Sequence, residues 1–422
     1  MYKILRELVK YCIFGKIFYN IHMKIGIIRE GKTPPDKRVA LTPQQCEHLL
    51  ATYPNLEIVV QPSNIRCYSD SAYKDLGIPM QKDLSDCDTI IGVKEVPIQY
   101  LIPEKKFFYF SHTIKKQPYN KKLLKAMLAK NIHMIDYEVL TNEHKHRLIG
   151  FGRFAGIVGA YNGLLTLGKR NKSFELKPAH QCEDKVELDN ELKNIIFPKG
   201  FKLVVTGRGR VAHGALEIIE QLDIKKLDVE SYLNYSGDEP VYCHIDLDSY
   251  VKRKDGEAFD FKHFRNNPTD YDNNFLRFAH TSDMFIAGHF YGNNSPYFFT
   301  REDAKHPEFR IRVVSDISCD IDGPVASTIQ PSTIADPIYG YNPITERVDD
   351  FDKEDVISVM AVDNLPCELP KDASDHFANV LTANVIPALL GDDKTGIIER
   401  ATICKDGKLG SYFEYLSDYA YN

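Results

Sequence analysis

Tryptophan is absent from this sequence of 422 residues, and neither sign of charge dominates it. Lys and Arg number 53 and Asp and Glu number 59, so the formal net charge is −6. A slightly acidic chain is not drawn as a whole to nucleic acid or to anionic membranes. Apolar runs of about 20 residues, the length that a membrane span needs, are also lacking. We therefore expect no nucleic-acid partner and no membrane span, and we predict a cytoplasmic protein.

C-x-x-C pairs are lacking too, although the sequence holds nine cysteines. Because their number is odd and their spacing irregular, they fit neither a disulfide framework nor a zinc module. Inert thiols in a reducing compartment are the simpler interpretation. The histidines are scattered, and the close pair His144 and His146 is expected to lie solvated in an exposed turn. The sequence thus predicts no metal site.

What the sequence does contain is a globular composition, with 43% hydrophobic and 27% charged residues. The length exceeds what one core needs, which favours two domains. Short apolar runs alternate with helical patterns, and this alternation predicts an α/β fold with parallel sheets. The predicted strands are 25–28, 56–60, 89–93, 107–110, 133–135, 202–205, 241–245, 284–287 and 311–314, and the clearest helices are 43–50, 121–130 and 374–390.

The first 22 residues are predicted to be an N-terminal extension outside the fold, because Met23 begins the first strand pattern. Lys10 and Lys16 interrupt their apolar character, and a membrane-surface helix is the alternative. The polar stretch 168–200 is interpreted as a connection between the two domains. The irregular region 252–274 is interpreted as a long excursion within the second domain.

A glycine pattern follows the strand at 202–205 and precedes a helix. Gly207, Gly209 and Ala212 form G-x-G-x-x-A in the context of a dinucleotide-binding turn. Gly207 permits the tight turn, Gly209 lets the backbone approach a pyrophosphate, and Ala212 allows close packing of the helix. A tight turn without a ligand is the alternative.

The residue that selects the dinucleotide is less clear. An acid that binds the ribose normally lies about 20 residues beyond the turn, but Asp246 comes later, after the strand at 241–245. The stretch 223–239 has the character of an insertion. Arg208 or Arg210 is the alternative, since either can bind a 2′-phosphate. NAD and NADP both stay open.

Polar residues also follow the strands of the first domain. Arg38 lies in the loop after the first strand, and Lys94, His112 and Glu138 follow three later strands. Each one alone is most simply a surface or hydrogen-bonded residue. Together, however, they lie at strand ends, where open α/β sheets bind ligands. Lys94 and His112 can perform general acid–base chemistry on a carbonyl or imine, and Arg38 can bind a carboxylate.

These segments resemble a known superfamily. R-V-A-L-T-P at 38–43, V-K-E at 93–95 and S-H-T at 111–113 resemble the alanine dehydrogenase and saccharopine dehydrogenase superfamily. Its closer branch is lysine–ketoglutarate reductase, the lysine-forming saccharopine dehydrogenase. The further segments that resemble this branch are 114–117, 135–138, 147–156, 315–320 and 362–370.

The resemblance implies two Rossmann-like domains with parallel sheets and an active-site cleft between them. Residues 23–165, completed by 370–422, would form the catalytic domain, and 166–369 the dinucleotide-binding domain. The implied reaction is the reversible reductive amination of a 2-oxo acid with an amino acid, with NAD or NADP as cofactor. An alanine, opine or other amino-acid dehydrogenase and a non-catalytic dinucleotide sensor are the alternatives, and the oligomeric state stays open.

The resemblance also implies residue roles. Lys94 matches the catalytic base and His112 the catalytic acid. The residues that match substrate contacts are Arg38, Gln117, Glu138 and Arg147, and those that match cofactor contacts are Phe151, Gly207, Arg208, Gly209, Arg210, Ala212, Asp246 and Asp320.

Overall fold

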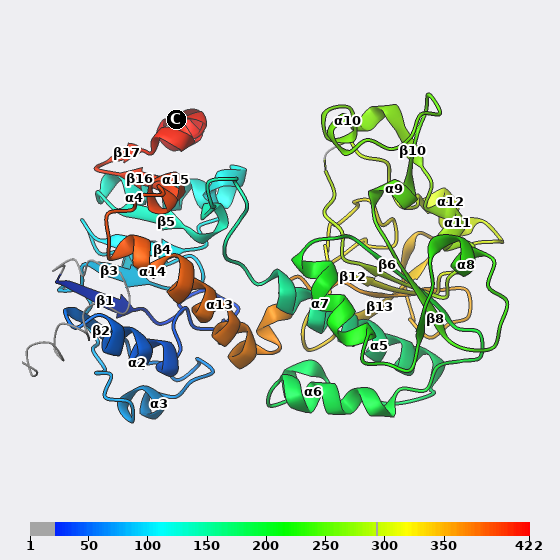
Figure 1. Ribbon diagram of the computed structural model, residues 1–422, viewed down its shortest axis with the longest axis horizontal. Coiled ribbons are helices and arrows are strands. Elements are labelled where there is room, and N and C mark those ends of the chain that lie inside the picture. The colour runs from blue at the N-terminus through cyan, green and yellow to red at the C-terminus, as the bar shows by residue number, and fades with distance from the viewer. Residues whose placement is uncertain (1–21, 293) are drawn as a thin grey trace, which may run out of the picture. The chain divides into compact units, whose positions relative to one another are not determined.

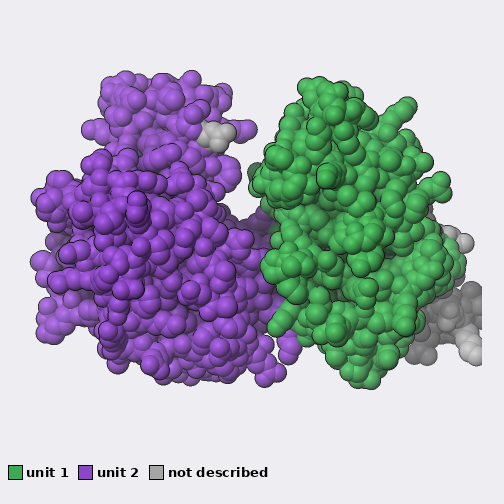
Figure 2. Space-filling model, turned by 180° about the vertical axis from the view of Figure 1, so that it is seen from behind, with its two compact units in different colours: residues 1–150, 374–422 green, residues 151–373 purple. Residues whose placement is uncertain are grey.

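The structure is a computed structural model that describes residues 22–292 and 294–422. It divides into two compact units, which Figure 2 distinguishes by colour. Unit 1 ends at Gly150 and resumes with Ser374–Asn422, and unit 2 comprises Phe151–Ala373. All but the last residue of the predicted N-terminal extension lies outside the described residues. Among the described residues, no helix is both long enough and apolar enough to cross a membrane.

Both junctions lie away from the predicted positions. The predicted boundary at 165 lies inside helix α5 (Gly152–Asn171), which is buried over most of its length. A Cβ atom on Gly156 would lie 1.9 Å from the carbonyl oxygen of Val211 in helix α7 (Arg210–Ile219), so α5 packs backbone to backbone inside unit 2. The stretch 168–200 therefore belongs to unit 2 and does not connect the two units.

Unit 1 is built on a seven-stranded sheet, ordered β17-β16-β5-β4-β3-β1-β2 (Figure 1). The first five strands run parallel, as predicted, and an antiparallel hairpin extends the sheet beyond β5. The strands are β1 (Met23–Ile27), β2 (Leu56–Val60), β3 (Thr89–Ile91), β4 (Lys106–Tyr109), β5 (His133–Asp136), β16 (Thr402–Lys405) and β17 (Lys408–Leu409). The helices are α2 (Pro43–Thr52), α3 (Asp70–Lys74), α4 (Lys121–Ala129), α13 (Pro370–Asn384), which spans the second junction, α14 (Ile386–Leu389), α15 (Ile397–Ala401) and α16 (Ser417–Tyr421).

Unit 2 is built on an eight-stranded sheet, ordered β14-β13-β15-β12-β11-β6-β8-β7. Its central strands are parallel, and β13 and β14 form an antiparallel edge. The strands are β6 (Lys202–Thr206), β7 (Lys225–Lys226), β8 (Val241–Ile245), β11 (Met284–Ala287), β12 (Val313–Asp316), β13 (Ile338–Asn342), β14 (Arg347–Asp349) and β15 (Ile357–Met360).

Helices cover both faces of this second sheet (Figure 1). Successive residues of a strand point to opposite faces. In β6, Leu203 and Val205 join one buried cluster with α5 and α7, while Val204 joins another with Phe275 and Phe285. Burial on both faces explains why the strands are continuous apolar runs, and the predicted α/β fold is confirmed. Apart from two helices in the excursion, the remaining helices are α6 (Lys185–Glu191), α8 (Val229–Leu233), α11 (Leu276–Ala279) and α12 (Arg301–Lys305).

The predicted excursion is a small substructure after β8. It consists of α9 (Leu247–Tyr250), β9 (Val251–Arg253), α10 (Phe261–Asn266) and β10 (Tyr271–Asn273), with β9 and β10 paired as an antiparallel ribbon. It lies within unit 2 and adds no third unit, as predicted. Its aromatic residues contribute to the core on that side of the sheet.

Candidate functional site

The carboxyl ends of β1, β3, β4 and β5 bring polar residues together in unit 1. Because these strands are parallel neighbours, they end at one edge of the sheet. Glu30 follows β1, Lys94 and Glu95 follow β3, His112 follows β4 and Glu138 follows β5. Segments far apart in sequence thus form one polar site.

Glu95 orients His112. The imidazole Nδ1 lies 2.6 Å from Glu95 Oε1, and Lys32 Nζ lies 2.8 Å from Glu95 Oε2. Burial raises the pKa of Glu95, but the hydrogen bonds from His112 and Lys32 outweigh it and lower the pKa to about 2. An ionised carboxylate can only accept, so Nδ1 carries the hydrogen and Nε2 is left to exchange protons. The side chain of His112 is 26% exposed, so a substrate can reach it.

The backbone around His112 is fixed from several sides. His112 has a left-handed conformation, with φ +52° and ψ +20°, and its carbonyl accepts a hydrogen bond of 3.2 Å from Asn120. The N–H of Ser111 donates to Asp136 at 3.0 Å, and Phe110 stacks on the imidazole with 6.3 Å between ring centres. Burial raises the pKa of the accepting Asp136 to about 6. These contacts position the imidazole before any substrate binds.

Lys94 is held through its backbone. The carboxylate of Glu30 accepts hydrogen bonds from the N–H of Val93 at 2.7 Å and from that of Lys94 at 2.9 Å. Burial and the negative charge of Asp36 raise the pKa of Glu30 to about 8, despite these two hydrogen bonds. Glu30 therefore fixes the turn after β3 and is largely protonated at neutral pH.

Arg38 binds a carboxylate of the chain itself. Its Nε lies 3.0 Å from Asp36 Oδ1 and its Nη2 lies 2.6 Å from Oδ2, and both side chains are almost fully buried. Burial raises the pKa of Asp36, but the charge and hydrogen bonds of Arg38, with a smaller effect of Lys94, lower it to about 2. Asp36 thus lies within the electrostatic reach of Lys94. A contact between Arg38 and a substrate carboxylate stays a prediction.

The other predicted substrate residues surround the same edge. The guanidinium carbon of Arg147 lies 5.6 Å from the ring centre of Phe110, which itself stacks on His112. Glu138 Oε1 lies 3.7 Å from Lys115 Nζ, and its Oε2 is buried without a hydrogen-bond partner in the described part of the chain. Gln117 accepts hydrogen bonds from two tyrosine hydroxyls, Tyr119 at its side chain and Tyr419 at its carbonyl.

The glycine turn of unit 2 has the geometry of an anion site. Gly207 has φ +103°, and a Cβ there would lie 2.5 Å from the carbonyl oxygen of Gly288. Gly209 precedes α7, and a Cβ there would meet nothing within 4 Å, so there is room for a ligand at the helix N-terminus. A Cβ on Gly288 would lie 3.2 Å from the Cα of buried Ala212, which shows how closely helix and strand pack.

The remaining cofactor predictions lie around this turn. Arg208 Nη1 lies 3.4 Å from Asp246 Oδ2, directly after β8, and the guanidinium carbon is 4.4 Å from the ring centre of Phe261. Phe151 is the N-cap residue of α5. A Cβ atom on the next residue, Gly152, would lie 3.3 Å from the Cβ of Arg210. Asp320 is exposed in the loop after β12.

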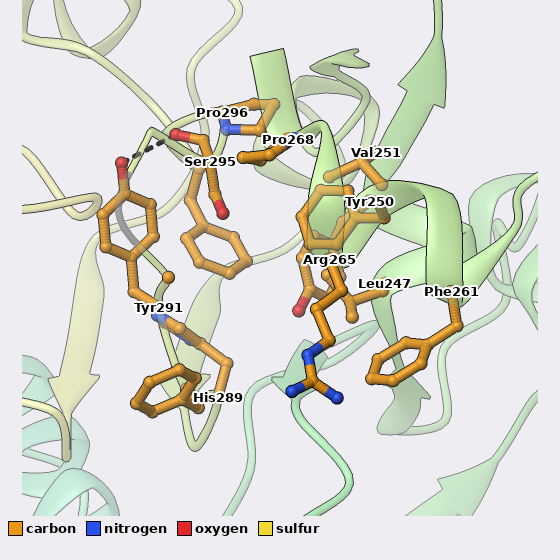
Figure 3. Close-up of a pocket in the computed structure, with 14 residues that line it drawn as sticks. Leu247, Tyr250, Val251, Phe261, Arg265, Pro268, His289, Tyr291, Ser295 and Pro296 are labelled. Atoms are coloured by element: carbon orange, nitrogen blue, oxygen red, sulfur yellow. Dashed lines mark hydrogen bonds between the residues drawn. The ribbon is translucent and has the colours of Figure 1, made fainter. Parts of the chain in front are cut away.

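A pocket of about 440 Å³ adjoins the turn (Figure 3). Arg265 and Phe261 lie on one side of it, and His289 and Tyr291 lie on the other. Half of the residues that line it have an aromatic ring, with further rings from Tyr250, Phe264, Phe290 and Phe298. A flat ring with apolar faces suits such walls.

His289 joins this pocket to the turn. Its Nδ1 lies 3.0 Å from the hydroxyl of Thr206, the last residue of β6, and its Cα lies 2.8 Å from where a Cβ on Gly207 would be. Burial lowers the pKa of His289 to about 3, so the ring is neutral. Its Nε2 is buried without a hydrogen-bond partner in the described part of the chain.

The sequence did not reveal which residues position the predicted site residues. Glu95 stands next to Lys94 in sequence, yet its partner His112 lies on another strand. Asp36 was signalled by D-x-R, an acid two residues before Arg38, but the pair could not be told from two surface charges. The pocket rings come partly from the excursion and partly from the segment after β11, and neither pattern gave an indication of a site.

Comparisons with known proteins agree with this architecture. Residues 26–158 match the family model described as alanine dehydrogenase/PNT, N-terminal domain. The chain is 29% identical to the alpha-aminoadipic semialdehyde synthase of Arabidopsis thaliana, covering 93% of this chain and 41% of that protein. It is 25% identical to the saccharopine dehydrogenase [NAD(+), L-lysine-forming] of Emericella nidulans, covering 87% of this chain and 91% of that protein. The chain thus spans less than half the length of the synthase but nearly all of the dehydrogenase.

Solved structures show the same fold. An L-alanine dehydrogenase superimposes with a TM-score of 0.63 at 15% identity, covering 94% of this chain and all of that one. The transhydrogenase from Sinorhizobium meliloti superimposes with a TM-score of 0.55 at 12% identity, covering 92% and 99%. The resemblance expected from the sequence is confirmed. Residues 26–158 are similar to the alanine dehydrogenase/PNT N-terminal domain, and most of the chain is similar in sequence to an alpha-aminoadipic semialdehyde synthase and to a lysine-forming saccharopine dehydrogenase.

Proposed function

We propose that the protein is an NAD(P)-dependent oxidoreductase that acts on the C–N bonds of amino acids, of the lysine-forming saccharopine dehydrogenase type. Its substrates would be an amino acid and a 2-oxo acid, joined by reversible reductive amination. The observation that supports this most is the pair of Lys94 and a carboxylate-bonded His112 at the ends of neighbouring strands. A proton acceptor and a proton donor are what the condensation and the hydride step both need.

The residues of unit 1 would handle protons and charge. As the amine attacks the carbonyl carbon, a C–N bond forms, the amine loses a proton to Lys94 and the oxygen gains one from His112 Nε2. Lys94 returns that proton to the new hydroxyl, which leaves as water as the C=N bond forms, and the C=N carbon accepts hydride. Glu95 stabilises the protonated imidazole, and Arg147 and the buried oxygen of Glu138 are suited to the carboxylate and ammonium groups of the substrates.

The residues of unit 2 fit a dinucleotide. Gly207–Arg210 and the start of α7 would hold the pyrophosphate, and the aromatic pocket beside His289 would hold the adenine. The ion pair after β8 holds a group suited to each dinucleotide. Asp246 can bind the ribose 2′-hydroxyl of NAD, and Arg208 can bind the 2′-phosphate of NADP. A bound nicotinamide dinucleotide would supply or accept the hydride.

The test is to follow NADH and NADPH oxidation with 2-oxoglutarate plus lysine, and separately with pyruvate plus ammonia. Turnover with lysine and 2-oxoglutarate supports the proposal. Turnover with pyruvate and ammonia alone would contradict the saccharopine type and favour an alanine dehydrogenase. Tight dinucleotide binding without turnover in either mixture would favour a non-catalytic sensor. A cytoplasmic location stays a prediction.

A further inference from the structure

Two histidines and a glutamate form a cluster in unit 2, at the end of the sheet opposite to the glycine turn. His280 Nδ1 lies 3.7 Å from Glu308 Oε2, and His306 Nδ1 lies 4.0 Å from the same oxygen. The two imidazoles stack with 5.6 Å between ring centres and 20° between planes. We propose that His280, His306 and Glu308 form a binding site for a divalent transition metal, with zinc the best match.

The ligand chemistry matches zinc. Two imidazole nitrogens and one carboxylate oxygen are a known tetrahedral donor set, with a fourth position open to water. Metal–ligand bonds of about 2.1 Å place tetrahedral donor atoms roughly 3.4 Å apart. One atom from each of the three residues already lies within 4.8 Å of the others. Because the side chain of Glu308 is 71% exposed, it can close the remaining gap by changing rotamer.

Without a metal, these three side chains form only weak polar contacts with one another. The two nitrogen–oxygen distances exceed the length of an ordinary hydrogen bond. The contact inside the cluster that does qualify is a long one of 3.3 Å, from the backbone N–H of Glu308 to His306 Nδ1. A cation at the centre would displace that weak contact and bind three donors at once.

The backbone presents the ligands from two anchored segments. His280 follows α11, whose last residue Ala279 is fully buried. The carbonyl of Ala279 accepts a hydrogen bond of 2.9 Å from the N–H of Arg310, which ties the segment of Glu308 to that of His280. Phe309 is buried and donates to the carbonyl of His306 at 2.9 Å. Ligands on such fixed segments lose little conformational entropy on binding.

The position of the cluster indicates a structural role. His280 precedes β11, and His306 and Glu308 precede β12, so the site lies at the amino ends of these strands. Gly207 follows β6, the parallel neighbour of β11, and therefore lies at the carboxyl end. A metal here would join the end of α11 to the turn after α12 and stabilise unit 2 without touching the dinucleotide. This inference is independent of the proposed activity.

The experiment uses the full chain, stripped of metal with a chelator and titrated with zinc by calorimetry. We expect one equivalent to bind and to raise Tm, because a ligand that binds the folded state stabilises it. His280→Ala and His306→Ala should each weaken binding at least tenfold. Glu308→Gln, which keeps the size of the side chain, should also weaken it. Cobalt should give the intense visible absorption of a tetrahedral site.

The matched control is a His144→Ala, His146→Ala variant, which removes an exposed histidine pair from unit 1. It should bind zinc as the wild type does. Unchanged affinity in a His280→Ala, His306→Ala variant would overturn the proposal and assign the zinc to cysteine thiols. The lack of any binding at micromolar zinc would overturn it as well. If an alanine variant fails to fold, Glu308→Gln decides the question alone, with dinucleotide binding as the check on unit 2.

Discussion

Glu95→Gln tests whether the orientation of His112 matters for catalysis. The change keeps the shape of the side chain but removes the charge that faces the imidazole Nδ1 at 2.6 Å. The amide can present either oxygen or nitrogen to Nδ1, so it no longer fixes which ring nitrogen carries the hydrogen. Glu95 touches no substrate in this scheme and acts through His112 as a positioning residue.

The expected loss of kcat can be derived from the lowered pKa of Glu95. The pKa of Glu95 falls from its ordinary 4.5 to about 2. Each unit corresponds to 1.36 kcal/mol, so the donors favour the ionised form by about 3 kcal/mol in net terms. His112 and Lys32 share this interaction, which leaves roughly 1.5 to 2 kcal/mol for the imidazole. We therefore expect kcat to fall on the order of ten- to thirtyfold.

The assay is steady-state turnover with the reduced dinucleotide at saturation, combined with a fluorescence titration of dinucleotide binding. Because Glu95 belongs to unit 1 and the glycine turn to unit 2, the dissociation constant of the dinucleotide should not change. Lys32→Met is the matched control, since it removes the more exposed donor and keeps the pair of Glu95 and His112. Its effect on kcat should be smaller. An unchanged kcat in Glu95→Gln would refute the reasoning.

Four further substitutions test other parts of the molecule. Lys94→Met should abolish turnover and leave the dissociation constant of the dinucleotide nearly unchanged, and an active variant would remove Lys94 from the mechanism. Gly156→Ala should lower Tm, with a loss of about 1 to 3 kcal/mol or more in a urea titration, because the new Cβ would lie 1.9 Å from the carbonyl oxygen of Val211. Asp246→Ala should lower kcat/KM for NADH and Arg208→Ala that for NADPH, so kcat/KM measured with both dinucleotides identifies the natural cofactor.

The strands were predictable because their signal is local. A strand covered on both faces is a continuous apolar run, and the predicted ends at 56–60, 241–245 and 284–287 agree with β2, β8 and β11. The hairpin of β16 and β17 was missed because each strand is short and one has two residues. Helix α5 shows a different limit. Its sequence indicates burial, but the choice of unit depends on close packing against α7.

The site was predictable only in part, for a physical reason. Strand ends in a parallel sheet converge, so Lys94 and His112 could be expected to lie near each other. Which acid orients the histidine depends on side-chain geometry between strands, and the sequence leaves that open. The cluster of His280, His306 and Glu308 joins two loops that are far apart in the chain, so no local spacing pattern reveals it. A site formed by residues from separate segments can be recognised once the topology is known.

The acids of unit 1 explain how a chain of net charge −6 can offer a site to an anion. Glu95 and Asp36 are ionised, since cations and hydrogen bonds lower the pKa of each to about 2 against the effect of burial. Each of these charges is matched by a neighbouring cation. Glu30 differs, because burial and Asp36 raise its pKa to about 8, so at neutral pH it adds little negative charge beside Lys94. An ionised Glu30 would add a further negative charge at this edge and would repel the 2-oxo acid of the proposed reaction.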